Sequence, residues 1–165
     1  MSGKGNPTES LARVLNAKSG KGKKIAIIAA EWHPEIVDTM ILNAQSELQR
    51  LGTKKVDLYR VPGSFEIPVM AAHLVDSYDA LIALGLVLRG GTAHFEYVCS
   101  GVTQGITHLS VTKKKPIAFG VLMCDTIEQA IDRSGAAGAA ENKGAECAEA
   151  VIATLLAIDS IKISS

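Results

Sequence analysis

Residues 23–52 read KKIAIIAAEWHPEIVDTMILNAQSELQRLG, and this stretch decides the fold. Residues 25–30 form a continuous apolar run between charged neighbours, which is typical of a strand buried on both faces of a sheet. Pro34 follows at a position that the first turn of a helix tolerates. Apolar residues then recur at helical spacing until Gly52, where the helix is expected to end. The stretch therefore predicts one buried strand followed by one amphipathic helix.

The same alternation continues toward the C-terminus. Further strands are predicted at 56–61, within 78–88 and at 116–123, and further helices at 64–75, 95–109, 128–133 and 145–159. Repeated strand–helix units give parallel strands that are joined by right-handed crossovers. We therefore predict an α/β fold with three αβα layers, in which helices flank an open, flavodoxin-like sheet of four parallel strands.

A single domain is expected to account for most of the chain. Its 165 residues lie within the usual domain size of about 100–200 residues. Residues 23–165 carry the alternating pattern and are predicted to form one α/β domain. Residues 1–22 are rich in Gly, Lys and Ser, so we expect a flexible N-terminal arm; a short edge strand and a basic targeting arm are the alternatives.

The composition excludes several classes of partner. Lys plus Arg number 17 and Asp plus Glu also number 17, so the formal net charge is zero and general nucleic-acid binding is not expected. Apolar residues make up 47% of the chain but aromatic residues only 4%, which predicts an aliphatic core. For a chain of this size, the apolar content also indicates burial against copies of itself.

Membrane and secretory segments are not expected either. No apolar run in the sequence reaches the ~18 residues of a membrane span, and the N-terminus lacks the hydrophobic segment of a secretory signal. We therefore expect a cytoplasmic protein without membrane contact.

The cysteines and histidines do not have the spacing of a metal site. Cys99, Cys124 and Cys147 each lie in an apolar stretch without a CxxC motif, so we predict three buried free thiols. The four histidines are scattered along the chain. We predict neither a metal nor a cofactor.

The polar and aromatic exceptions of this aliphatic chain follow the predicted strands. They are, in chain order, Glu31-Trp32-His33, Gly63-Ser64-Phe65-Glu66, Arg89-Gly90-Gly91-Thr92 with His94, and Cys124-Asp125-Thr126. Ligands of open parallel sheets bind outside the carboxyl ends of the strands. The four groups are therefore expected to meet at one edge of the sheet, called the carboxyl edge below, and to form the site there.

Gly90-Gly91-Thr92 is the strongest local signal for a ligand. Two glycines between a strand and a helix let backbone N–H groups face a ligand without an intervening Cβ. Thr92 can cap the following helix, whose N-terminus carries partial positive charge. The pattern predicts a cradle for a small phosphate, and a turn that simply needs glycine is the alternative. Neither GxxxxGK[ST] nor GxGxxG occurs in the chain.

Other side chains near this edge each have two interpretations. His94 is either a proton carrier beside the anion or a surface histidine. Trp32 either stacks on a flat heterocycle or covers the core, and Glu66 either binds ligand hydroxyls or caps backbone donors. Arg133 and Lys143 are either functional or solvated charges around a Gly/Ala-rich segment.

Four stretches, together and in this order, resemble the 6,7-dimethyl-8-ribityllumazine synthases of riboflavin biosynthesis. They are VPGSFEIP (61–68), LGLVLRGGTAHFEYV (84–98), PIAFGVLMCDTIEQAIDRSG (116–135) and NKGAE (142–146). The resemblance extends from about residue 23 to the C-terminal helix. It implies an enzyme that condenses 5-amino-6-(ribitylamino)pyrimidine-2,4-dione with 3,4-dihydroxy-2-butanone 4-phosphate and releases phosphate and water.

The resemblance also implies roles for single residues. His94 matches the proposed general acid–base. The residues matched to the pyrimidine and ribityl groups are Trp32, which would stack on the ring, Ser64, Phe65, Glu66, Leu86, Val87, Leu88 and Phe119. The residues matched to the phosphate are Gly91, Thr92, Arg133 and Lys143. Phe119, Arg133 and Lys143 match positions that a neighbouring subunit lends to the site.

Two departures from the family pattern affect these expectations. Gly91 stands where relatives often carry a side chain, which predicts looser phosphate binding. Residues 134–142, SGAAGAAEN, are longer than the turn of relatives that build sixty-subunit shells, which favours a homopentamer. A functional link to riboflavin synthase is implied as well.

Two other functions compete with the enzyme. One is a flavin- or lumazine-binding relative without catalysis, and the other is a structural shell protein. Gly91-Thr92, His94 and Arg133 together favour the enzyme, because a flavin binder needs no phosphate clamp beside a histidine.

Overall fold

The structure, a computed structural model, describes residues 14–163. Its elements are β1 (Lys24–Ala30), α2 (Pro34–Arg50), β2 (Lys55–Val61), η1 (Ser64–Glu66), α3 (Ile67–Leu74), η2 (Val75–Ser77), β3 (Ala80–Leu88), α4 (His94–Lys113), β4 (Ile117–Cys124), α5 (Ile127–Ile131) and α6 (Lys143–Ile163). They confirm the predicted alternation of strands and helices.

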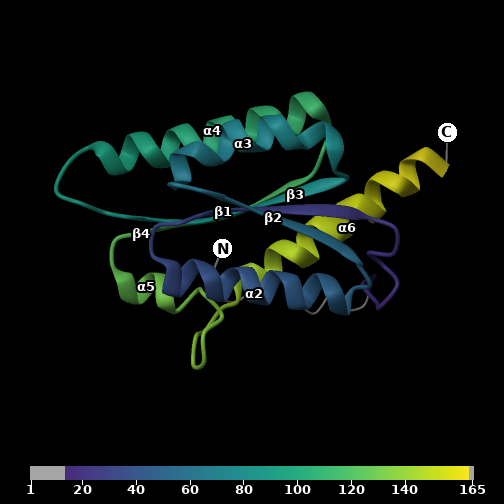
Figure 1. Cartoon of the computed structure of the whole chain (residues 1–165), viewed down its shortest axis with the longest axis horizontal. Helices are drawn as coiled ribbons and strands as arrows, with labels where there is room; N and C mark the ends of the chain where they lie inside the picture. Colours follow the sequence, from purple (N-terminus) through teal and green to yellow (C-terminus); the bar gives the residue numbers. More distant parts are fainter. Residues whose placement is uncertain (1–13, 164–165) are drawn as a thin grey trace.

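The four strands form one parallel sheet in the order β2-β1-β3-β4. The strand order doubles back after β2, because β3 pairs with the opposite side of β1. Helices α3 and α4 cover one face of this sheet and α2, α5 and α6 cover the other (Figure 1). The predicted three-layer, flavodoxin-like α/β fold is therefore confirmed.

Alternation along the two central strands builds a separate core on each face of the sheet. Ile25, Ile27 and Ala29 pack under α2 and α6, whereas Ala26 and Ile28 pack under α3 and α4. All five of these side chains are fully buried. A strand that is buried on both faces needs an apolar residue at every position, which explains the unbroken apolar run in the sequence.

Glycines on α4 let the segment after β2 approach closely. A Cβ at Gly101 would lie 2.8 Å from Cε2 of Phe65, and a Cβ at Gly105 would lie 2.8 Å from Cβ of Pro68. Side chains at these two positions would push η1 and α3 away from α4. The position of Phe65 thus depends on a helix that lies far from it in the sequence.

The prediction of one continuous helix at 64–75 is wrong. The structure divides it into η1, α3 and η2. Pro68 lies in the first turn of α3 and has no N–H to donate, so a continuous α-helix from Ser64 would lack a hydrogen bond there. The last helix also begins earlier than residue 145, because the Asn142 side chain accepts a hydrogen bond from the Ala145 N–H at 3.0 Å.

The predicted N-terminal arm falls mostly on residues 1–13, outside the described part of the chain. Residues 14–22 contain no strand and run mainly through turns. Leu15 is buried in the core, and the Gly20 N–H donates to the Leu51 carbonyl at 2.7 Å. This part of the segment is therefore packed against the end of α2.

The prediction of three buried thiols is correct for Cys124 and Cys147 and wrong for Cys99, which is only partly buried. Val98, Val102 and Ile106 form the buried side of α4, and Cys99 lies one residue away from that side. Burial disfavours the charged thiolate and raises the pKa of Cys147 to about 12.

We expect a thiol reagent at pH 8 to modify Cys99 in the folded protein and to leave Cys124 and Cys147 unmodified. Burial raises the pKa of all three thiols, so access by the reagent decides: Cys99 is partly exposed, whereas Cys124 and Cys147 are buried. Titration with and without denaturant measures the difference, and Cys99→Ser should remove the modification of the folded protein. Rapid modification of a second thiol in native protein would contradict this prediction.

Candidate active site

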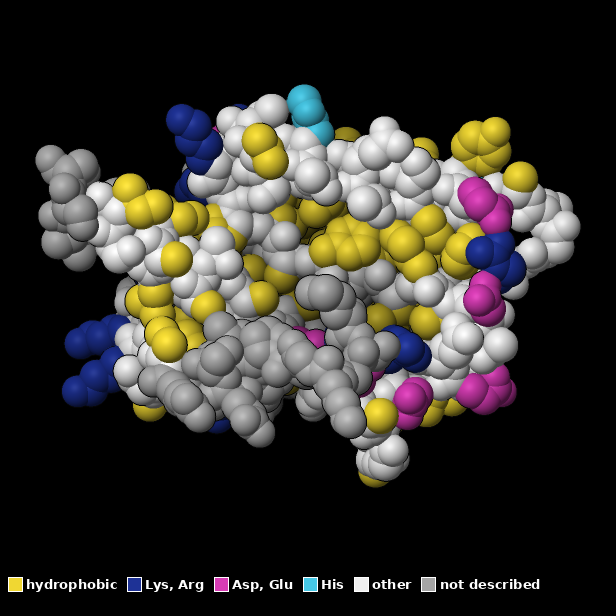
Figure 2. Space-filling view, turned by 180° about the vertical axis from the view of Figure 1, so that it is seen from behind, with side chains coloured by type: hydrophobic (Ala, Val, Ile, Leu, Met, Phe, Trp, Pro, Cys, Tyr) yellow, Lys and Arg dark blue, Asp and Glu magenta, His cyan; other side chains and the backbone are white. Residues whose placement is uncertain are grey.

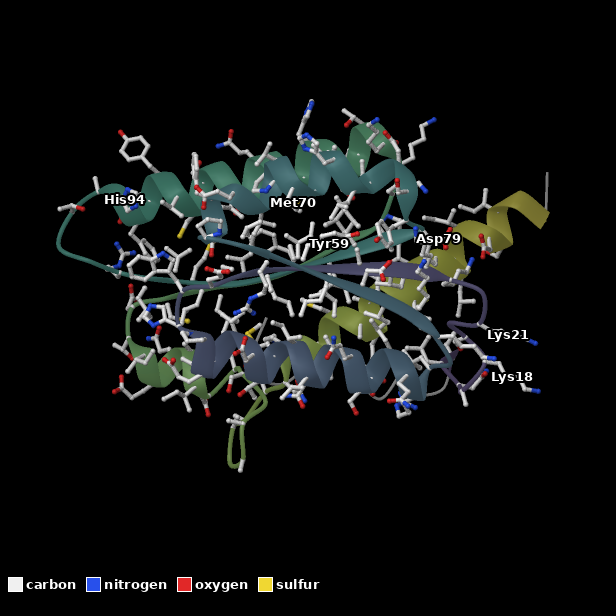
Figure 3. All side chains as sticks on the ribbon, viewed as in Figure 1. Lys18, Lys21, Tyr59, Met70, Asp79 and His94 are labelled. Atoms are coloured by element: carbon white, nitrogen blue, oxygen red, sulfur yellow. The ribbon has the colours of Figure 1, made fainter. Side chains whose placement is uncertain are left out.

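A cavity of about 600 Å³ lies at the carboxyl edge of the sheet. It is lined by Trp32, His33, Gly63, Ser64, Phe65, Glu66, Leu86, Val87, Leu88, His94, Tyr97 and Val98. These residues come from the ends of β1, β2 and β3 and from the first turns of α4. Asp79 precedes β3 and His94 follows it, and the two lie toward opposite ends of the molecule in Figure 3.

Trp32 presents its ring to solvent beside the cavity. It lies two residues after the end of β1, and 67% of its surface is exposed. The next residue, His33, adopts a left-handed backbone conformation (φ 57°) and stands at the N-cap of α2. This conformation turns the chain sharply from strand to helix. An exposed indole at the mouth of a cavity favours a stacking platform over a cover for the core.

The turn after β2 supplies both a buried hydroxyl and an exposed ring. Ser64 is buried, and its Oγ lies 3.5 Å from the carbonyl oxygen of Leu86. A Cβ at Gly85 would lie 2.5 Å from this Oγ, so glycine at that position leaves room for the hydroxyl. Phe65 is 58% exposed, and Glu66 also lines the cavity.

His94 begins α4 at the side of the cavity and is exposed. Its backbone N–H donates to Thr92 Oγ1 at 3.4 Å. In the loop before it, a Cβ at Gly90 or Gly91 would meet nothing within 4 Å. The first backbone N–H groups of a helix point outward unpaired, so an open loop and a helix start together suit an anion.

Arg89 connects this loop to neighbouring segments, a role that sequence reasoning did not assign. Its Nε donates to Asp125 Oδ1 at 2.5 Å, its Nη1 pairs with Glu96, and its guanidinium lies 4.2 Å from the centre of the Phe95 ring. The hydrogen bond from Arg89 holds the pKa of Glu96 below its usual value. The signal for this role in the sequence was a charged residue immediately before Gly90.

Tyr97 and Val98 also line the cavity. Sequence reasoning missed them because they belong to an ordinary helical pattern.

Five of the predicted site residues do not line this cavity. They are Gly91, Thr92, Phe119, Arg133 and Lys143. Gly91 and Thr92 lie in the loop just before His94. Phe119 is exposed on the edge strand β4. The back view in Figure 2 shows hydrophobic side chains gathered across the middle of that face of the molecule.

Arg133 and Lys143 both make contacts elsewhere in the chain. Arg133 Nη1 donates to the Gln129 carbonyl at 2.8 Å. Lys143 Nζ lies 2.6 Å from Glu141 and 2.7 Å from Glu146. Burial alone would lower the pKa of Lys143, but the two carboxylates hold it above its usual value.

Within residues 14–163, no group of three or more His, Cys, Asp or Glu side chains is arranged to hold a metal ion. In the same part of the chain, no helix is both long and apolar enough to span a membrane.

Comparisons with known proteins show the family of the chain. The model of the 6,7-dimethyl-8-ribityllumazine synthase family matches residues 22–158. The 6,7-dimethyl-8-ribityllumazine synthase of Streptomyces avermitilis is 47% identical over 98% of this chain and 97% of its own length. Those of Paenarthrobacter aurescens and Cutibacterium acnes are also 47% identical, over 96% and 88% of this chain and 98% and 88% of their own lengths. The chain therefore belongs to the 6,7-dimethyl-8-ribityllumazine synthase family.

Proposed function

We propose that the cavity at the carboxyl edge catalyses the reaction of this family. The 5-amino group of 5-amino-6-(ribitylamino)pyrimidine-2,4-dione attacks the ketone of 3,4-dihydroxy-2-butanone 4-phosphate and forms an imine with loss of water. Phosphate is then eliminated, and ring closure with loss of a second water gives 6,7-dimethyl-8-ribityllumazine. The observation that carries the proposal is that one cavity unites an exposed indole, a buried hydroxyl and a histidine beside an open glycine loop.

The residues around the cavity divide between the two substrates. We assign the pyrimidine ring to Trp32 and to the backbone of residues 86–88, and the ribityl chain to residues 64–66. We assign the phosphate to Gly91, Thr92 and the first turn of α4, because unpaired N–H groups and the helix dipole both favour an anion there.

His94 is then the proton carrier for the steps that move protons between nitrogen, carbon and oxygen. It borders the cavity and begins the helix whose N-terminus faces the phosphate site. Holding two reactants side by side removes most of the entropic cost of their encounter, and general acid–base assistance adds to this effect.

The site is completed by a neighbouring subunit in this proposal. Phe119, Arg133 and Lys143 match functional positions of the family but do not line the cavity of their own chain. A cyclic assembly would place these residues against the cavity of the next copy.

Residues 134–142 form a narrow loop, closed by a bridge between Ser134 and Asn142, that projects from the α2 side of the molecule (Figure 1). This projection favours a free pentamer over a sixty-subunit shell.

Mixing the purified protein with both substrates and recording lumazine fluorescence tests the reaction. We expect fluorescence that requires both substrates and grows in proportion to the enzyme concentration. No product, together with tight binding of lumazine or riboflavin, would instead favour a binding protein without catalysis. Native mass measurement separates a pentamer from a shell.

Arg133→Ala should raise the apparent KM for the butanone phosphate by about 10–100-fold, the equivalent of one lost charge-assisted contact of about 1.5–3 kcal/mol. The apparent KM for the pyrimidine should change little. Arg50→Ala is the matched control, because Arg50 pairs with Glu47 at the far end of α2. An unchanged KM for the butanone phosphate would remove Arg133 from the phosphate site.

A mixture of two variants tests whether the site is shared. Subunits with His94→Ala and subunits with Arg133→Ala are unfolded together and reassembled. If each site takes His94 from one chain and Arg133 from the next, random mixing restores about one intact site in four. Activity no higher than the average of the two separate variants would show that each chain forms its site alone.

A further inference from the structure

Arg89 holds three segments together at the carboxyl edge. It follows the last residue of β3, and its backbone N–H donates to the Cys124 carbonyl at the end of β4 at 2.9 Å. Its side chain reaches Asp125 in the loop after β4 and Glu96 in the first turn of α4. One residue therefore connects the end of β3, the end of β4 and the beginning of α4.

The loop between Arg89 and His94 has little else to hold it. Residues 90–94 are all exposed, and a Cβ at Gly90 or Gly91 would touch nothing within 4 Å. The hydrogen bond between the His94 N–H and Thr92 is local and long, at 3.4 Å. Since two glycines give the loop wide backbone freedom, its geometry depends on how its two ends are fixed.

The exposure of the three side chains argues against a purely stabilising role for the Arg89 contacts. The side chains of Arg89, Glu96 and Asp125 are 45%, 55% and 61% exposed. Exposed ion pairs contribute little to folding stability, and salt screens them. The contacts do, however, keep the carboxylates of Glu96 and Asp125 paired with the Arg89 guanidinium, next to the loop to which we assign the phosphate.

We propose that Arg89 is a positioning residue for phosphate binding. It fixes the loop 90–93 and the first turn of α4 against the end of β4, so that the loop N–H groups and His94 face the same substrate. It also holds the carboxylates of Glu96 and Asp125 away from the phosphate, which they would otherwise repel. The inference rests on the proposed function of the cavity.

Steady-state kinetics of Arg89→Gln test this role. We expect the apparent KM for the butanone phosphate to rise about 10-fold or more, while the apparent KM for the pyrimidine stays within about 2-fold. Arg89→Lys, which can pair with one carboxylate but lacks the planar fork, should recover part of the loss. Equal weakening for both substrates, or a Lys variant no better than Gln, would overturn the proposal.

A double variant separates positioning from direct contact. If Arg89 acts through Asp125, the Arg89→Gln/Asp125→Asn protein should bind phosphate no more weakly than Arg89→Gln alone. If the two losses multiply instead, Arg89 acts by another route and the proposal fails. Lys113→Gln is the control, since Lys113 forms an exposed ion pair with Asp76 at the far end of the same helix.

Hydrogen exchange of the ligand-free protein gives a readout that does not depend on the reaction. The amides of Arg89 and Tyr97, which donate to the Cys124 and Ala93 carbonyls at the two ends of the loop, should exchange faster in Arg89→Gln than in the wild type, with the rest of α4 unchanged. Absence of lumazine formation by the wild-type protein would refute the proposed function but leave this measurement valid. Unchanged exchange at Arg89 and Tyr97 would refute the positioning role whatever the activity.

Discussion

The His94→Ala variant is expected to form lumazine about 10²–10⁴-fold more slowly than the wild type, without losing activity completely. This range is what a general acid–base contributes when the other sources of rate acceleration remain. His94 borders the cavity, whereas Trp32, Ser64 and the glycine loop, which orient the substrates in our proposal, are untouched by the change. Turnover should fall much more than the affinity for either substrate.

Initial rates at saturating substrates measure this effect, after native mass measurement has shown that the variant assembles normally. His108→Ala is the matched control, because His108 is exposed on the same helix but does not line the cavity. An unchanged rate would show that His94 carries no proton. Complete loss of activity in an assembled variant would show that proximity contributes less than we propose.

The Gly144→Ala variant is expected to lose about 3 kcal/mol of the free energy of unfolding. Gly144 lies in the first turn of α6, where this helix crosses α2. A Cβ there would lie 2.2 Å from the Met40 carbonyl oxygen. Backbone atoms cannot rotate away as a side chain can, so the two helices must separate. Met40 and Ile152, which are fully buried between the helices and the sheet, would lose packing contacts.

Denaturant unfolding followed by circular dichroism measures this loss. Gly90→Ala is the control, since it makes the same chemical change where an added Cβ meets nothing within 4 Å. Its stability should differ little from that of the wild type. Equal stability of the Gly144 and Gly90 variants would show that the α2–α6 contact adapts to a methyl group without cost.

Much of the fold could be predicted because its signals are local. The apolar run at residues 25–30 and the helical spacing that follows it need no knowledge of distant residues. Element boundaries were less accurate where a single side chain changes a hydrogen bond. Pro68 separates η1 from α3 within one predicted helix, and the Asn142 cap starts the last helix earlier than its apolar pattern does.

The candidate site was partly predictable for a related reason. In a parallel sheet, every strand ends at the same edge, so residues that follow the strands must meet there. This rule placed Trp32, Ser64 and His94 around one cavity, as the structure has them. It could not place Phe119, Arg133 or Lys143, because their predicted roles depend on a second copy of the chain.

By itself, the sequence of this protein determined the α/β alternation, the edge of the sheet where the site lies and the family resemblance. These follow from the order of residues along the chain, because strand and helix periodicities and turn motifs are short-range properties. Only the tertiary structure decided how closely α6 approaches α2 at Gly144 and which carboxylates Arg89 engages. Such contacts join residues that are distant in sequence, and their geometry depends on how all the layers pack at once.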